Sequence, residues 1–180
     1  YYFAALAPMN SANWKLNTAA ANTYGAGIVD FHNVDGTEDL LYAAKMLSTK
    51  GLQAGEAPED GIVKLQFSHL LSKVKFSFTN GFDNANAKID VKNVRMEVPA
   101  FASINLAVEN WWDNDDWKLT DETLTLEFGN VETMGIRDVD GKTAAKERLT
   151  IPTDAAYPHK VTFIANVYVG DQLTVFEKEA

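Results

Sequence analysis

Apolar and polar side chains alternate with a period of two along residues 63–79 (VKLQFSHLLSKVKFSFT). Such alternation places one set of side chains on one face of a β-strand and the other set on the opposite face. The apolar set occupies odd positions up to Leu71 and even positions from Val74 onward. This change of phase requires a bulge, or a crossing between two sheets, between Leu70 and Lys73. The pattern therefore predicts one long, bent strand that serves both layers of a β-sandwich.

Shorter runs predict the remaining strands, at residues 1–6, 28–31, 88–98, 101–108, 124–128, 148–151, 161–169 and 172–177. The run at 88–98 also changes phase, which predicts a bulge near Lys92 and Asn93. Glycine first in the two-residue connection at 170–171 is the signature of a type II′ hairpin. Residues 38–47 have helical propensity but could equally be extended beside a sheet edge. Many short strands separated by turns predict an all-β, antiparallel sandwich.

The clearest linker is residues 51–61 (GLQAGEAPEDG), which combine glycine, proline and acidic residues with little apolar content. We place the main domain boundary there. The prediction is the end of one β domain over residues 1–60 and a β-sandwich over residues 61–180.

Composition narrows the classes of function. The 180-residue chain has 25 acidic and 16 basic side chains and a formal net charge of −9, which argues against nucleic acid and anionic lipid as partners. The chain contains no cysteine, which excludes disulfides, thiolate metal sites and a cysteine nucleophile. No apolar run approaches the roughly 18 residues that a membrane span needs. A hydrophobic content of 46% is enough to fill a core.

His69 occupies an apolar position of the alternating run, where a histidine is usually a hydrogen-bonded structural residue. His32 and His159 are distant in sequence, so nothing groups the three histidines into a metal or catalytic site. We predict a structural role for His69.

Residues 136–147 match a calcium loop only in part. If Gly141 takes the sixth position of an EF-hand loop, Ile136 takes the first, where its side chain cannot coordinate. The EF-hand hypothesis fails. A looser cation contact at Asp138 and Asp140 stays open beside the interpretation as a solvated, charged loop.

Tryptophans flank acidic residues in residues 111–117 (WWDNDDW). Exposed aromatic rings beside carboxylates can stack on and hydrogen-bond a sugar ring, so Trp111, Trp112 and Trp117 are candidate glycan contacts. The alternative is a loop whose tryptophans pack on the sandwich. No nucleophile elbow, P-loop, HExxH or dinucleotide-binding glycine motif occurs. We therefore predict a protein that is not an enzyme and has no cofactor and no bound metal.

Four elements follow one another in a recognisable order. An apolar strand ends in Ala-Pro at residues 1–8, and Asp39-Leu40-Leu41-Tyr42-Ala43 follows it. Next come residues 63–74, with Phe67, His69 and the Leu-Ser-Lys sequence at 71–73, and then Leu149-Thr150-Ile151-Pro152. In these elements the chain resembles the fimbrillin-like (Mfa-like) proteins of Bacteroidales, the subunits and tip components of type V pili.

The resemblance implies two transthyretin-like β-sandwich domains, with residues 1–60 as the end of the N-terminal domain and residues 61–180 as the C-terminal one. It also implies export as a lipoprotein anchored in the outer membrane, trimming after an arginine, and assembly on the cell surface by strand exchange. The family's lipobox cysteine, its processing arginine and its final tryptophan and Gly-x-Tyr strand are not found here. None of Arg95, Arg137 and Arg148 holds the processing position. We expect either that both ends are truncated or that this is a divergent member whose missing strands come from a neighbouring subunit. No anchoring, cleavage or donor-strand residue is carried over.

The first hypothesis for function is a structural fimbrial subunit that polymerises by β-strand exchange and supports adhesion, with other pilus subunits as partners. An incomplete sandwich would offer a groove, with residues 63–79 and 161–169 as its walls, to an extended segment of another subunit. The alternative is a surface glycan- or host-binding adhesin of the same fold, with the three tryptophans in its site.

Overall fold

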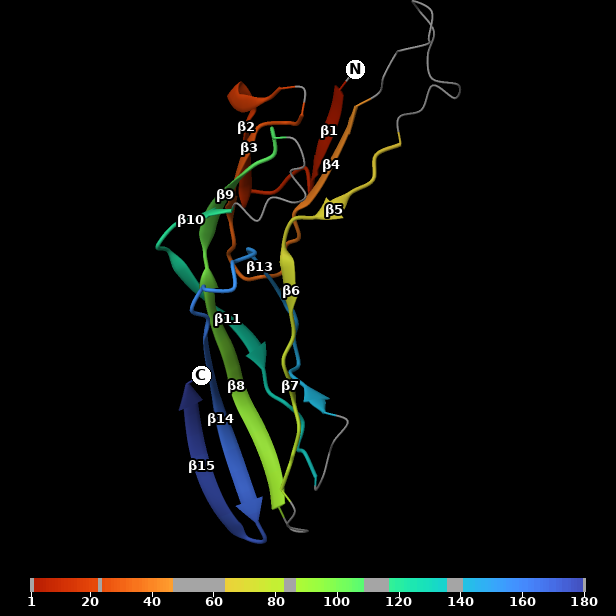
Figure 1. Cartoon of the computed structure of the whole chain (residues 1–180). Coiled ribbons are helices and arrows are strands. Elements are labelled where there is room, and N and C mark those ends of the chain that lie inside the picture. The colour runs from red at the N-terminus through yellow and green to blue at the C-terminus, as the bar shows by residue number, and fades with distance from the viewer. Residues whose placement is uncertain are drawn as a thin grey trace, which may run out of the picture.

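The computed structural model describes residues 2–22, 24–46, 64–82, 87–108, 117–135 and 141–179. Figure 1 shows an elongated molecule built almost entirely of antiparallel strands, which confirms the prediction of an all-β fold. A single 3₁₀ turn, η1 (Thr18–Ala20), is the one helical element among the described residues.

The end of the molecule that carries the N-terminus is formed by two small sheets. One has the order β1-β4-β5, and the other β10-β9-β3-β2. Their bounds are β1 Tyr2–Ala7, β2 Trp14–Asn17, β3 Ile28–His32, β4 Leu41–Met46, β5 Ser68–His69, β9 Phe101–Asn105 and β10 Lys118–Leu119. Alternate side chains of these strands and their loops form the first core, which consists of Val29, Phe31, Leu40, Tyr42, Leu70, Leu71, Ala102, Ile104, Leu106, Trp117 and Ile151.

The opposite end is dominated by one long four-stranded sheet of order β11-β8-β14-β15. Its strands are β8 Ala87–Pro99, β11 Thr123–Gly129, β14 Lys160–Val169 and β15 Gln172–Glu179. Two short pairs complete this end, β6 (Ser72–Val74) with β13 (Arg148–Thr150) and β7 (Ser77–Phe78) with β12 (Lys142–Thr143). The second core lies here and consists of Val91, Val94, Met96, Val98, Leu126, Phe128, Val131, Met134 and Ala144.

The alternating run at 63–79 does not form the single long strand that the sequence predicts. Its described part holds three short strands, β5, β6 and β7. Leu70 and Leu71 are adjacent and both buried in the first core, an arrangement that a regular strand cannot provide because neighbouring side chains point to opposite faces. Beyond them, Phe76 packs edge-on against Phe128 of the second core, with ring centroids 4.7 Å apart. The predicted change of phase between Leu70 and Lys73 is confirmed, and it is where the chain passes from one core to the other.

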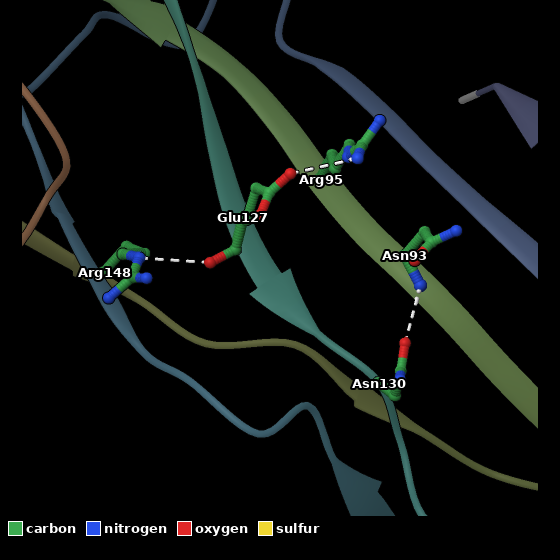
Figure 2. Close-up of polar contacts among 5 residues, drawn as sticks. All are labelled: Asn93, Arg95, Glu127, Asn130 and Arg148. Atoms are coloured by element: carbon green, nitrogen blue, oxygen red, sulfur yellow. Dashed lines mark hydrogen bonds and ion pairs between the residues drawn. The ribbon is translucent and has the colours of Figure 1, made fainter.

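The predicted bulge near Lys92 and Asn93 is confirmed. β14 pairs Thr162 with Arg95 but Ile164 with Lys92, so β8 carries one extra residue there. Asn93 has φ 53° and its backbone N–H donates to Asn130 Oδ1 at 3.0 Å. Figure 2 shows this bond beside the Arg95–Glu127 ion pair (3.0 Å) and the bond from Arg148 Nε to the Glu127 carbonyl oxygen (3.1 Å). The first two contacts fix the bulged stretch of β8 against β11 and the residue after it, and the third joins β13 to β11.

Two further expectations are settled by backbone geometry. Residues 41–46 are extended as β4, the second of the two conformations left open by the sequence, and they pair with β1 along their whole length. Gly170, the first residue of the predicted turn, has φ 61°. Asp171, the second, has negative φ, because Asn93 is the sole described non-glycine residue with positive φ. These signs are the ones that a type II′ turn requires.

The predicted domain boundary between residues 60 and 61 lies outside the described residues and stays a prediction. The transthyretin-like topology also stays a prediction.

Candidate functional site

The last strand of the long sheet has a free edge. β15 is bonded to β14 and to no other described strand. Val169 and Gln172 flank the two-residue turn and form the first hydrogen-bonded pair of the hairpin. Because hydrogen-bonded and non-hydrogen-bonded pairs alternate in an antiparallel ladder, the N–H and C=O groups of Leu173, Val175 and Glu177 point away from β14. This backbone edge is open to another strand.

Apolar side chains are exposed on both faces of β15. Leu173 and Val175, 52% and 57% exposed, project from one face, and Phe176, 46% exposed, projects from the other. Soluble proteins usually protect an edge strand with charge, proline or a covering element, and exposed apolar groups along such an edge mark an interaction site. β15 therefore combines unpaired backbone groups with the apolar side chains that a partner strand would cover.

A second open edge belongs to β4, toward the other end of the molecule (Figure 1). β4 pairs with β1 along its whole length, but with β5 only at Leu41 and Tyr42. On that side, residues 43–46 have no strand partner in the part of the chain that the structure describes. Residues 65–67 precede β5 with a strand-like alternation but form no strand, and Phe67 is 43% exposed. The backbone of residues 43–46 is a second candidate pairing site.

A cleft of about 560 Å³ lies between these two edges, where β5 and β6 meet β13. It is lined by Gly36, Thr37, Asp39, His69, Leu71, Lys73, Glu147, Arg148 and Leu149. Within the cleft, His69 Nδ1 lies 2.5 Å from Asp39 Oδ2, and Lys73 Nζ forms an ion pair with Glu147 Oε1 at 2.5 Å. Beside the cleft, hydrogen bonds from the Thr37 side chain and then its backbone lower the pKa of Asp35. These contacts connect the elements where the two ends of the molecule meet, which indicates a structural role for the cleft.

His69 is hydrogen-bonded, as predicted, but its predicted place on the buried face is wrong. Its side chain is 71% exposed. The physical reason is the local break of the strand, because burial of both Leu70 and Leu71 turns the preceding residue outward.

We expect His69→Ala to change the free energy of unfolding by less than about 1 kcal/mol, because a polar contact made by so exposed a side chain contributes little. The neighbouring substitution Leu70→Ala removes a buried side chain and should cost about 2–5 kcal/mol. Urea unfolding of the two variants measures the difference. A His69→Ala cost as large as that of Leu70→Ala would contradict this assignment.

The candidate glycan contacts are only partly described by the structure. Trp117 is 8% exposed and packs edge-on against Phe31 in the first core, with ring centroids 6.5 Å apart. Little of its ring is available to a sugar. Trp111 and Trp112 lie outside the described residues. Glycan contact by this trio stays a prediction, and it rests on those two tryptophans.

The candidate cation contact at Asp138 and Asp140 also lies outside the described residues. Within the described ranges, no group of three or more His, Cys, Asp or Glu side chains is placed to hold a metal ion. No described helix is long and apolar enough to cross a membrane.

The sequence predicted β14 and β15 but gave no sign that the edge of β15 is open, because strand order is a property of the sheet. The β4 edge was missed since residues 38–47 carry a helical propensity. The burial of Leu40 and Tyr42, two residues apart, fits an extended chain, but burial is seen only in the structure, and residues 40–44 show no alternation in the sequence.

Comparison with known proteins gives one match. A family model described as fimbrillin-like matches residues 1–176. No curated protein and no solved structure matches the chain.

Proposed function

This chain belongs to the fimbrillin-like family of cell-surface pilus subunits, and we propose that it joins its neighbours in the pilus by β-strand exchange. The observation that carries the proposal is the free edge of β15. Its outward backbone groups and its exposed Leu173, Val175 and Phe176 are what a β-augmented partner uses.

The second open edge supplies a partner surface. Residues 43–46 of β4 belong to the N-terminal end of the molecule, whereas the turn of the β14–β15 hairpin marks the opposite end (Figure 1). Two different surfaces that bind each other make a heterologous contact, and a heterologous contact that does not close into a ring continues as a filament. We propose that β15 of one subunit pairs with the β4 edge of the next.

The gain on pairing has two parts. Each new backbone hydrogen bond contributes about 0.5–1.5 kcal/mol net. Covering the apolar side chains of β15 adds about 25 cal/mol for each Å² removed from water. Residues 63–79 remain our proposal for one wall of the receiving groove, and the exposed Phe67 supports it. Residues 161–169, the other wall expected from the sequence, form β14, which is paired on both sides by β8 and β15 and therefore does not border the β4 edge.

The proposal includes what the family implies for the whole protein. The precursor would be a lipoprotein anchored in the outer membrane, and the finished fimbria would support adhesion. Contact with surface glycans or host proteins through Trp111, Trp112 and Trp117 is the alternative function.

A peptide with the sequence of residues 171–180 tests the exchange. We expect it to bind the purified protein and to shorten filaments seen by negative-stain electron microscopy, because it competes for the receiving edge. The matched control is the same peptide with proline at position 175, which lacks an N–H and should be inactive. Equal activity of the two peptides, or a protein that stays monomeric at all concentrations, would contradict the proposal.

A further inference from the structure

The outer face of the β2–β3–β9 sheet carries a small pocket that is separate from both open edges. Its volume is about 240 Å³, and its lining includes Asn13, Trp14, Lys15, Asp30, His32 and Phe101. Strand alternation explains the composition. Val29, Phe31 and Ala102 point into the first core, so Asp30, His32 and Phe101 point to the opposite face.

Two ring side chains from neighbouring strands, His32 and Phe101, line this pocket. The rings of His32 and Phe101 are cross-strand neighbours, with centroids 6.2 Å apart and planes inclined by 57°. Trp14 is the register partner of Phe31 and packs against the first core, where its Nε1 donates a 3.0 Å hydrogen bond to the Pro8 carbonyl oxygen. The partly accessible rings of His32 and Phe101 suit the apolar C–H face of a sugar ring.

The polar side chains of the pocket retain unused hydrogen-bonding capacity. Lys15 and Asp30 are direct partners in the β2–β3 register, yet they form no ion pair within 4.0 Å. Within the described part of the chain, neither side chain has a hydrogen-bond partner, and the same is true of the side-chain amide of Asn13. An ammonium, a carboxylate and an amide thus face one space with nothing bonded between them.

Adjacent hydroxyl groups of a pyranose match this set. One hydroxyl can accept from the Lys15 ammonium while its neighbour donates to the Asp30 carboxylate, and Asn13 can do either. An anionic sugar would face Asp30, the Glu122 carboxylate that lies 3.8 Å from His32 Nε2, and a chain of net charge −9. Pockets for drug-sized ligands are usually 300–1,000 Å³, so about 240 Å³ suits a single ring.

We propose that this pocket binds a terminal, uncharged pyranose residue of a glycan. The site lies on a sheet face and uses neither the β15 nor the β4 edge, so it does not depend on strand exchange.

The test is a titration of the ¹⁵N-labelled protein with the methyl glycosides of mannose, galactose, glucose and N-acetylglucosamine. We expect at least one of them to shift the amide signals of Asp30, His32 and Phe101, with a dissociation constant on the order of millimolar, as for a single ring. Asp30→Ala and Phe101→Ala should each weaken that binding tenfold or more. Ser103→Ala, on the same sheet face beside Asp30, should leave it unchanged.

Thermal unfolding of each variant shows whether it folds, and Asp30→Ala removes no core side chain. The proposal is overturned if no glycoside shifts these signals at about 50 mM, or if the shifts appear only elsewhere in the chain. Binding that survives Asp30→Ala in a folded protein also overturns it. So does tighter binding of a sialic acid glycoside than of any neutral one.

Discussion

Replacing Val175 with proline is expected to weaken filament formation strongly while leaving the monomer folded. Val175 lies at the centre of the β15 edge, and its N–H points away from β14. Proline removes that donor and its ring obstructs an approaching strand, whereas an edge strand tolerates proline where the N–H faces solvent. We expect the concentration needed for assembly to rise at least tenfold, since about 1.4 kcal/mol of lost pairing is sufficient. Light scattering and electron microscopy measure this change.

The matched control is Val175→Thr, which keeps the N–H and the β-branched shape. It should assemble nearly as the natural chain does, with a small loss from the added hydroxyl. Urea unfolding should place both variants within about 1 kcal/mol of the parent, because position 175 is exposed. Normal filaments from a folded Val175→Pro variant would show that β15 is not the assembling edge.

Trp117→Ala should lower the free energy of unfolding by about 3–5 kcal/mol. Trp117 is buried in the first core, and its T-shaped contact with Phe31 adds to the loss. Since domains of this kind are stable by about 5–15 kcal/mol in total, the variant should unfold at a clearly lower urea concentration.

Trp117→Phe retains an aromatic ring and should cost substantially less than Trp117→Ala. Comparing the pair separates packing from glycan binding, because a sugar-stacking residue could be removed without loss of stability. If the Trp117→Ala protein is as stable as the parent but deficient in glycan binding, Trp117 has a role in binding and not in core packing.

Local patterns in the sequence predicted most of the strands. Alternation located β8 and its bulge, and a single glycine at 170 specified the final hairpin. These features depend on neighbouring residues, whose spacing the sequence states directly. The family resemblance drawn from the 63–74 run and the Asp39–Ala43 element is confirmed by the fimbrillin-like match.

Features set by distant contacts were not predictable in the same way. The run at 63–79 alternates like one strand, but burial of Leu70 and Leu71 together divides it, and that burial depends on partners in β3, β4 and β9. The pocket on the β2–β3–β9 sheet could not be predicted from the sequence either. Its residues Lys15, Asp30 and Phe101 are far apart in the chain, and only the register of the three strands brings them together. Strand order, which decides which edges remain open, is likewise a property of the assembled sheet.

Site-resolved amide hydrogen exchange, compared between monomer and filament, tests the central claim most directly. In the monomer the amides of Leu173, Val175 and Glu177 face away from β14 and should exchange at nearly the rate of an unstructured chain. In the filament a paired strand should slow them by about 100-fold or more, together with amides in residues 43–46. Filaments in which the β15 edge amides still exchange freely would contradict assembly through this edge.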